Sequence, residues 1–151
     1  MSNVSLRETV NRSDIEAILK HPVIYNVISD DYSPALDKFT PPINDEYRYI
    51  GGYVNNKIIA LMVYHSFMNG NTCHVQVLPE YRHKYAQQFG QQSLLYRGND
   101  PLYAQIPSLY KNVLAFAESF GFAVFDKRLS DYQKDGQQYD TYIMRFTHGI
   151  C

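Results

Sequence analysis

The stretch from Thr72 to Arg97, TCHVQVLPEYRHKYAQQFGQQSLLYR, holds the residues whose types and spacing point most directly to chemistry. Alternating apolar residues predict a strand that ends at Leu78-Pro79. A basic and aromatic turn, Glu80 to Tyr85, then leads into a helix expected to begin near Ala86. The first N–H groups of a helix have no partner within it, and the helix dipole adds positive charge there. This strand, basic turn and helix are therefore expected to hold a phosphate-bearing ligand.

The downstream residues continue an alternation of strand and helix. Residues 101–107 predict a second strand, 108–120 a second helix, and Gly121-Phe122 the step into a third strand. In this order, and in the segment V-L-P-E-Y-R-H-K-Y-A, the chain resembles the GNAT superfamily of acyl-CoA-dependent N-acyltransferases, over roughly residues 47 to 147. In that superfamily the turn has the form R-G-x-G-x-G/A and cradles the pyrophosphate of CoA. Within it, the chain is most similar to a small branch encoded by short-tailed lambdoid phages and labelled as head assembly proteins.

The resemblance implies a cofactor, acetyl-CoA, and a set of residues that hold it. The pyrophosphate would lie on the basic turn, and the pantetheine would pair with the strand around Val77 as an added strand does. The backbone amides of Val77 and Leu78 would hold the oxyanion when an amine attacks the thioester. The residues expected to bind the cofactor are Val77, Leu78, Arg82, Lys84, Tyr85, Ala86, Gln87 and Asn112.

The chain departs from the superfamily pattern at positions that matter for chemistry. Glycines in the superfamily turn let backbone amides approach a pyrophosphate closely. This chain has His83 at one glycine position and, if a one-residue deletion is allowed, no residue at the position before Tyr85. The position of the general-acid Tyr is Ala117, and that of a usual Asn is Tyr110, with Asn112 one register away. These departures predict that acetyl-CoA binds weakly, and that acyl transfer is weak or lost.

Two residues, His74 and Tyr110, are the catalytic candidates if transfer occurs. The near-neutral pKa of a His suits the deprotonation of an ammonium, although a His on a strand is more often hydrogen-bonded or exposed. Tyr110 could protonate a leaving thiolate, but its helix position favours packing at the edge of the core. For Arg82 and Lys84, binding of a pyrophosphate and a solvated turn are equally supported interpretations.

Composition excludes several other classes. A chain of 151 residues fits a single domain, 1–151. The net charge of −1 gives no reason to expect nucleic-acid binding, and the basic cluster at 82–84 suits one phosphate group. The spacing of His65, His83 and His148 does not predict a metal site.

The two cysteines and the hydropathy predict a cytoplasmic protein. Cys73 is expected to face inward and Cys151 is the last residue, which does not make a secreted disulfide framework. No run approaches the ~18 apolar residues that a membrane span needs. The N-terminus lacks a signal-peptide core. We therefore expect the cytoplasm of the host cell, or association with the virion, and no membrane.

The remaining pattern predicts a mixed α/β sheet with helices on both faces. A capping box, Ser13 to Glu16, predicts a short helix that stops at His21-Pro22, and residues 23–45 are expected to be irregular apart from one or two helical turns near 35–39. Strands at 4–10, 47–54 and 57–67 precede the phosphate-site strand, with a tight turn at Asn55-Asn56. The helix after the phosphate-site strand is expected to end with a C-cap at Gly98-Asn99. Ser108 is expected to be the N-cap of the next helix, whose apolar face is Leu109, Val113, Phe116 and Phe120. A final hairpin of 122–129 and 139–147 is expected to turn near Asp135-Gly136. The helix-strand-helix stretch from 81 to 120 is expected to give one locally parallel step.

Two functions of different class follow. In the first, the fold binds a structural or internal virion protein during head assembly, through exposed tyrosines among the 14 in the chain. The candidates for that surface are Tyr132, Tyr139, Tyr142 and the loop from Tyr25 to Tyr32. In the second, the protein is an active N-acyltransferase that modifies an amine of a protein or of a small molecule.

Overall fold

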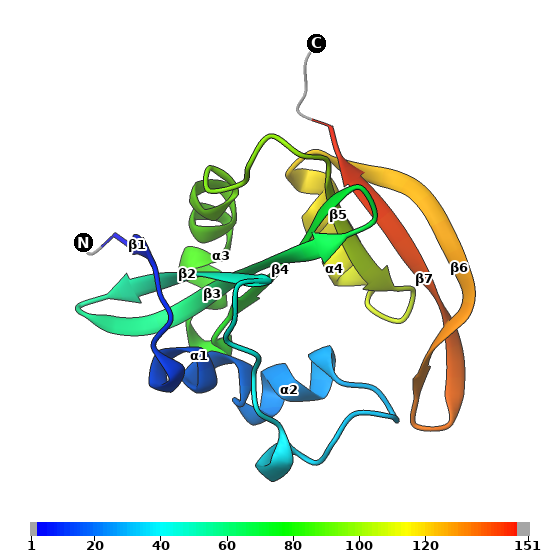
Figure 1. The fold of residues 1–151 in the computed structure, drawn as a ribbon, viewed down its shortest axis with the longest axis horizontal. Helices are drawn as coiled ribbons and strands as arrows, with labels where there is room; N and C mark the ends of the chain where they lie inside the picture. Colours follow the sequence, from blue (N-terminus) through cyan, green and yellow to red (C-terminus); the bar gives the residue numbers. More distant parts are fainter. Residues whose placement is uncertain (1–2, 148–151) are drawn as a thin grey trace. The chain divides into compact units, whose positions relative to one another are not determined.

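The computed structural model describes residues 3–147 (Figure 1), so the predictions on His148 and Cys151 lie outside the described residues. The elements along the chain are β1 (Ser5–Glu8), α1 (Arg12–Leu19), α2 (Pro22–Ile28), η1 (Leu36–Lys38), β2 (Tyr47–Val54), β3 (Lys57–Phe67), β4 (Gly70–Val77), α3 (Pro79–Leu94), β5 (Leu102–Pro107), α4 (Lys111–Ser119), β6 (Phe122–Lys134) and β7 (Gln137–Phe146). The strands form a seven-stranded sheet in the order β1-β2-β3-β4-β5-β7-β6. β4 and β5 pair in parallel at Asn71↔Leu102 and Thr72↔Tyr103, whereas β1-β2, β2-β3, β5-β7 and β6-β7 are antiparallel. The predicted mixed α/β sheet and its one parallel step are confirmed.

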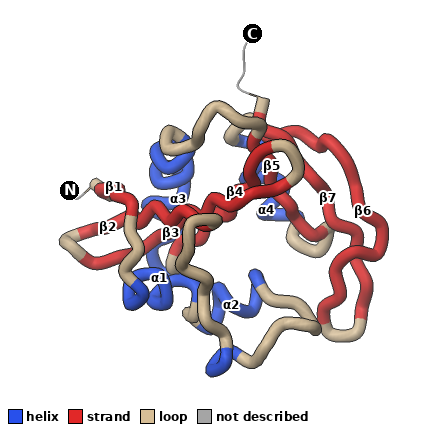
Figure 2. The backbone as a smooth tube through the Cα atoms, in the orientation of Figure 1, coloured by secondary structure: helices blue, strands red, loops and turns tan. Residues whose placement is uncertain are grey.

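The contacts divide the chain into two compact units, and β3 and β4 contribute residues to both. Within the described part of the chain, the first unit contains residues 3–29, 34–65 and 74–98. In it, α1 and α2 cover one face of β2 and β3, where Ile15, Ile18 and Ile24 belong to one core cluster with Tyr49 and Leu61. α3 covers the opposite face, because a Cβ on Gly52 would meet the ring of Phe89 (Figure 2). Helices therefore lie on both faces of this part of the sheet, as predicted.

Among the described residues, the second unit contains 30–33, 66–73 and 99–147. Tyr103 of β5 and Ile143 and Met144 of β7 are its most buried apolar side chains, and Ala117 of α4 is also buried. That the whole of 1–151 makes one domain stays a prediction.

The two tight turns that were predicted from asparagine and glycine are confirmed. Asn55 and Asn56 have φ of 52° and 65°, and Asp135 and Gly136 have φ of 52° and 78°. Each turn thus places two successive residues in the left-handed region that a two-residue hairpin needs. The last hairpin is longer than predicted, because β6 and β7 both continue to the turn.

The predicted start of the first helix is wrong, and a helix after it was missed. Asn11, and not Ser13, is the N-cap of α1: its side-chain oxygen accepts from the N–H of Asp14 at 3.0 Å. α2 begins at Pro22, where the sequence predicted the end of the preceding helix. Pro is favoured at the first helical position, because the N–H that it lacks has no helical partner there. The Nδ1 of His21 caps this helix by accepting from the N–H of Val23 at 3.2 Å.

The two later helices also differ at their ends from the prediction. α3 begins at Pro79 instead of near Ala86 and ends at Leu94, with Leu95 as C-cap in place of Gly98. α4 begins at Lys111 with the backbone of Tyr110 as N-cap, so Ser108 does not cap it. The predicted apolar face is only partly right, since Leu109 and Val113 are exposed while Phe116 and Phe120 are partly buried.

Candidate functional site

The junction between β4 and α3 is the place where the sequence predicted an anion site, and it contains no loop. Val77 ends the strand, Leu78 is the N-cap, and Pro79 is the first helical residue. The N–H of Leu78 donates to the carbonyl of Ile59 at 2.9 Å, and that of Tyr81 donates to the carbonyl of Leu78 at 2.9 Å. Pro79 has no N–H to offer. Two of the backbone donors at this helix end are therefore engaged, and a third position has none.

Arg82 binds its own chain at this junction. It lies in the first turns of α3, and its Nε donates to the carbonyl oxygen of Val77 at 2.9 Å. That carbonyl is the acceptor that a pantetheine would need in order to pair with β4. The expected pairing at Val77 and the expected amide of Leu78 are both occupied by contacts within the protein.

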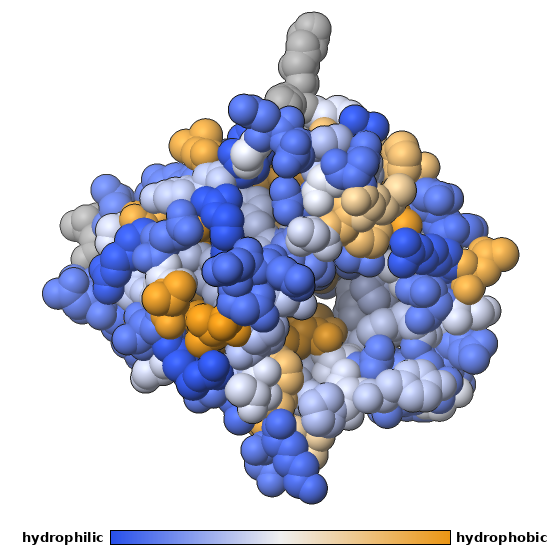
Figure 3. Space-filling view, in the orientation of Figure 1, coloured by the Kyte–Doolittle hydropathy of each residue, from blue (hydrophilic) through white to orange (hydrophobic). Residues whose placement is uncertain are grey.

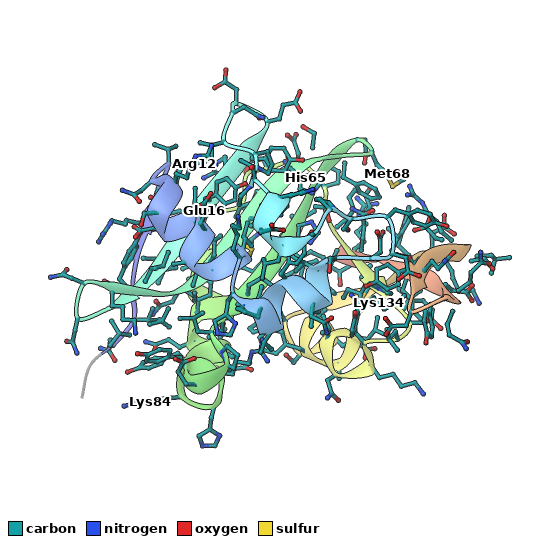
Figure 4. The ribbon with its side chains drawn as sticks, turned by 90° about the horizontal axis from the view of Figure 1, so that it is seen from below. Arg12, Glu16, His65, Met68, Lys84 and Lys134 are labelled. Atoms are coloured by element: carbon teal, nitrogen blue, oxygen red, sulfur yellow. The ribbon has the colours of Figure 1, made fainter. Side chains whose placement is uncertain are left out.

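The other predicted cofactor residues of this helix divide by exposure. Lys84 and Gln87 are exposed, Ala86 is partly buried, and Tyr85 is buried at 5 % exposure. Figure 4 shows Lys84 at the outside of α3, with its Nζ 5.4 Å from the centre of the Tyr85 ring. Tyr85 is thus a core residue, and its ring makes a cation–π contact with the ammonium group of Lys84. Glu80 adds a carboxylate in the first turn, where it opposes a bound phosphate.

His74 of β4 is hydrogen-bonded to His65 of β3, a partner that the sequence analysis did not assign. Their Nε2 atoms are 3.1 Å apart and their rings stack with centres 5.2 Å apart, while Tyr47 packs on His65 at 5.0 Å. Burial, with a smaller contribution from the charge on His65, lowers the pKa of His74 to about 4. His74 is neutral at pH 7, but a base with so low a pKa takes a proton from an ammonium poorly.

The partner of His74 could have been found from the sequence. His65 and His74 are equally far from the centre of Asn69-Gly70, a dipeptide that is typical of hairpin turns. Residues placed symmetrically about such a turn face each other across the two strands.

The remaining candidates lie in the second unit. The hydroxyls of Tyr110 and Tyr132 are 3.0 Å apart, and burial together with this hydrogen bond raises the pKa of Tyr132. Asn112 is exposed. Ala117, at the position of the superfamily's general acid, is 8 % exposed and faces the core. Tyr110 is therefore a half-buried packing residue with a phenol partner, which is the alternative that the sequence favoured.

The structure contradicts the predicted tyrosine surface at Tyr25, and the rest of that surface stays a prediction. Tyr132, Tyr139 and Tyr142 are each partly buried. Tyr25 is 7 % exposed and packs on Phe39, and only Tyr32, at 78 %, presents its ring to solvent.

Cysteine, metal and membrane features can be stated for residues 3–147. Cys73 is buried as predicted, and burial raises its pKa to about 12. Within this range, no three or more His, Cys, Asp or Glu side chains gather in a way that could hold a metal ion. None of the helices in the described part of the chain is long and apolar enough to cross a membrane.

Comparisons with known proteins find similar solved structures but no similar sequence family. No protein-family model matches the chain, and no curated protein matches its sequence. The solved structures that it resembles include the spermidine N-acetyltransferase of Vibrio cholerae in complex with CoA and spermine, with a TM-score of 0.74 at 14% identity over 95% of each chain. The ribosomal-protein-S18-alanine N-acetyltransferase of Escherichia coli matches with a TM-score of 0.70 at 18% identity, over 100% of this chain and 96% of that one. For yncA of Salmonella typhimurium, solved with its cofactor acetyl-CoA, the TM-score is 0.77 at 18% identity over 99% and 96%.

These likenesses establish the fold. The chain has the fold of the GNAT acetyltransferases, as the sequence resemblance predicted.

Proposed function

We propose that this chain is a GNAT-fold binding module in which acyl transfer from acetyl-CoA is weak or lost. The single observation that supports the proposal is the direct junction of β4 and α3. There the donors and acceptors that a cofactor would use are already bonded within the chain at Leu78, Tyr81 and Arg82. The residues present do not fit CoA, because a pyrophosphate needs free amides in a glycine-lined turn.

The size of the effect follows from the contacts that are missing. Each lost donor to a charged phosphate oxygen weakens binding by roughly 1–3 kcal/mol. The absent N–H of Pro79 and the engaged N–H of Leu78 together correspond to roughly 2–6 kcal/mol, and thus lower the expected affinity by about one and a half to four powers of ten relative to a complete site. Glu80 adds repulsion of the same sign.

The biological setting that we propose comes from the sequence resemblance to phage head assembly proteins. In that setting the partner is a structural or internal virion protein, and the place of action is the host cytoplasm or the virion. No nucleic acid is required, in keeping with the net charge of −1.

Calorimetric titration with acetyl-CoA tests the proposal. The wild-type protein is expected to give no nanomolar affinity. Arg82→Ala removes a guanidinium bound to the Val77 carbonyl and should leave any residual affinity unchanged or slightly raised. Lys38→Ala, an exposed lysine on η1, is the matched control for loss of one positive charge. Nanomolar binding that Arg82→Ala abolishes and Lys38→Ala preserves would contradict the proposal.

The second candidate is an active N-acyltransferase acting on an amine of a protein or of a small molecule. It is favoured by the likeness to the CoA and acetyl-CoA complexes and by the exposed Arg82 and Lys84 at the start of α3. A thiol-release assay with acetyl-CoA, spermidine and a lysine-containing peptide separates the two functions. The binding module gives no release above the protein-free rate, whereas release with saturation kinetics would establish the transferase.

A further inference from the structure

One surface of the second unit combines exposed apolar side chains with arginines. We call it the aromatic–arginine patch, and it consists of Phe67, Met68, Phe125, Arg128 and Arg145 around the buried ring of Tyr103. Met68 is 57 % exposed and Phe125 is 48 % exposed. Figure 4 shows Met68 at the end of the β3-β4 turn, and Figure 3 shows apolar surface near this turn and β6.

The rings of the patch are held in fixed positions before any partner binds. Phe67 and Phe125 each meet Tyr103 edge to face, with ring centres 5.6 Å apart in both pairs. Tyr103 is 1 % exposed, and its hydroxyl donates to the side-chain oxygen of Asn69 at 2.7 Å. A surface of this kind loses little side-chain entropy when a partner covers it.

The arginines of the patch have no carboxylate partner in the described part of the chain. The guanidinium carbon of Arg128 is 5.3 Å from the centre of Phe67, and that of Arg145 is 5.8 Å from the centre of Phe125. Among residues 3–147 neither arginine makes an ion pair, whereas neighbouring Lys127 pairs with Asp140 at 3.9 Å. The carboxylate of Asp126 accepts from the N–H of Lys127 at 2.8 Å. Two guanidiniums that lie near aromatic rings and make no ion pair within residues 3–147 have N–H donors for an incoming acid.

The adjacent strand does not favour simple strand pairing with another copy. β6 is the outer strand of the sheet order, but its register against β7 shifts between Val124 and Asp126 and again between Arg128 and Tyr132. Such irregularities protect an edge strand from pairing with a further strand. Recognition at this surface therefore depends on side chains.

We propose that the aromatic–arginine patch docks an acidic protein segment whose carboxylates meet Arg128 and Arg145 and whose apolar anchor packs between Met68 and Phe125. The proposal rests on the proposed function as a binding module and specifies the chemistry of its partner. Carboxylates match the fork of a guanidinium, and an aromatic or aliphatic side chain matches the exposed rings.

Selection from a displayed library of random 12-residue peptides tests the proposal. The baits are the wild-type protein, the double variant Arg128→Glu/Arg145→Glu, and a control, Lys38→Glu/Lys111→Glu, with the same charge change at exposed sites elsewhere. Peptides enriched on the wild type are expected to be acidic with one or two large apolar residues. A synthetic copy should bind the control like the wild type, but bind the arginine variant and Phe125→Ala at least about tenfold more weakly. Circular dichroism checks that each variant is folded.

Three outcomes would overturn this inference. One is that no peptide is enriched, or that the same peptides are enriched equally on the wild type and on Arg128→Glu/Arg145→Glu. Another is a concentration-dependent dimer that Arg128→Glu/Arg145→Glu dissociates, which makes a second copy the occupant. The third is tighter binding of a single-stranded oligonucleotide than of any peptide. Tight acetyl-CoA binding would overturn the proposed function whatever the peptides do, so the two failures are distinguishable.

Discussion

At the scale of single residues, the His65–His74 pair links protonation to stability. The folded pKa of His74 is about 4, below the value of about 6.5 for an unfolded His. Above pH 6.5 both states are neutral and stability is complete. As the pH falls from 6.5 to 4, only the unfolded state binds the proton, so the free energy of unfolding falls by about 1.4 kcal/mol per pH unit.

His74→Gln should remove this part of the pH dependence. Urea unfolding at pH 7.5, 5.5 and 4.5 should therefore show a shallower fall for His74→Gln than for the wild type. His83→Gln, which changes an exposed His on α3, is the control and should keep the wild-type slope. An unchanged slope in His74→Gln would show that the pair does not exclude the proton.

Ala117 provides a second test at a single residue. Restoring the superfamily's phenol by Ala117→Tyr places a large side chain at a position that is 8 % exposed. Overpacking should lower the free energy of unfolding by about 1–3 kcal/mol, with no gain in thiol release from acetyl-CoA. Ala115→Tyr, on the exposed side of the same helix, should change stability little in the same urea series. A stable Ala117→Tyr variant with new turnover would instead support the transferase.

At the scale of elements, β2 and α3 approach each other so closely that the strand needs a glycine. A Cβ on Gly52 would lie 2.6 Å from two ring atoms of Phe89, whose side chain is fully buried and cannot move aside. Gly52→Ala should therefore destabilise the protein by roughly 1–3 kcal/mol, measured by urea unfolding. Gly98→Ala is the matched control, because nothing lies within 4 Å of its added Cβ. Equal stability of the two variants would mean that this contact yields easily.

The β6-β7 hairpin is held at its tip by a residue from far away in the sequence. The carboxylate of Asp31 accepts from the N–H groups of Asp135 at 2.8 Å and Gly136 at 2.9 Å, and these backbone bonds lower its pKa, that to Gly136 most strongly. The support is present above the ordinary pKa of an Asp and is lost only as the pH falls through the lowered value.

Asp31→Ala should accelerate hydrogen exchange of the Asp135 and Gly136 amides, measured by NMR at neutral pH. Asp131→Ala, an exposed acid on β6, is the control and should leave both rates near those of the wild type. Unchanged exchange in Asp31→Ala would show that the turn holds without this carboxylate.

At the scale of the whole molecule, local chemistry predicted the order of strands and helices along the chain, but it misplaced the helix ends. Asn55-Asn56 and Asp135-Gly136 marked their hairpins because few other residue pairs tolerate two positive φ angles. Pro22 and Pro79 were read as breaks, although each is the first residue of a helix. Pro is favoured at the first helical position, but it also ends helices, and the prediction followed the second property. At Pro79 the expected glycine turn also placed the start of the helix too late.

The site was less predictable than the fold. The glycine losses at the junction were visible in the sequence, but the bond from Arg82 to Val77 depends on a helix that begins earlier than predicted. In the aromatic–arginine patch, Phe125 and Arg145 lie on the two strands of one hairpin, whereas Phe67 of β3 and Arg128 of β6 come from strands that are far apart in sequence. No local pattern in a single sequence specifies which side chains such strands bring together.

The position of Phe125 also has an optical consequence. The chain contains 14 Tyr and no Trp, so a single introduced indole would be the only fluorophore of its kind. Phe125→Trp places it at a site that is half exposed, beside Tyr103 and the guanidinium of Arg145, and an indole keeps the favourable contact with that cation. The wavelength of its fluorescence emission would change when a bound molecule excludes water from the indole ring. Following this change over time would give association and dissociation rates for any molecule that covers the ring.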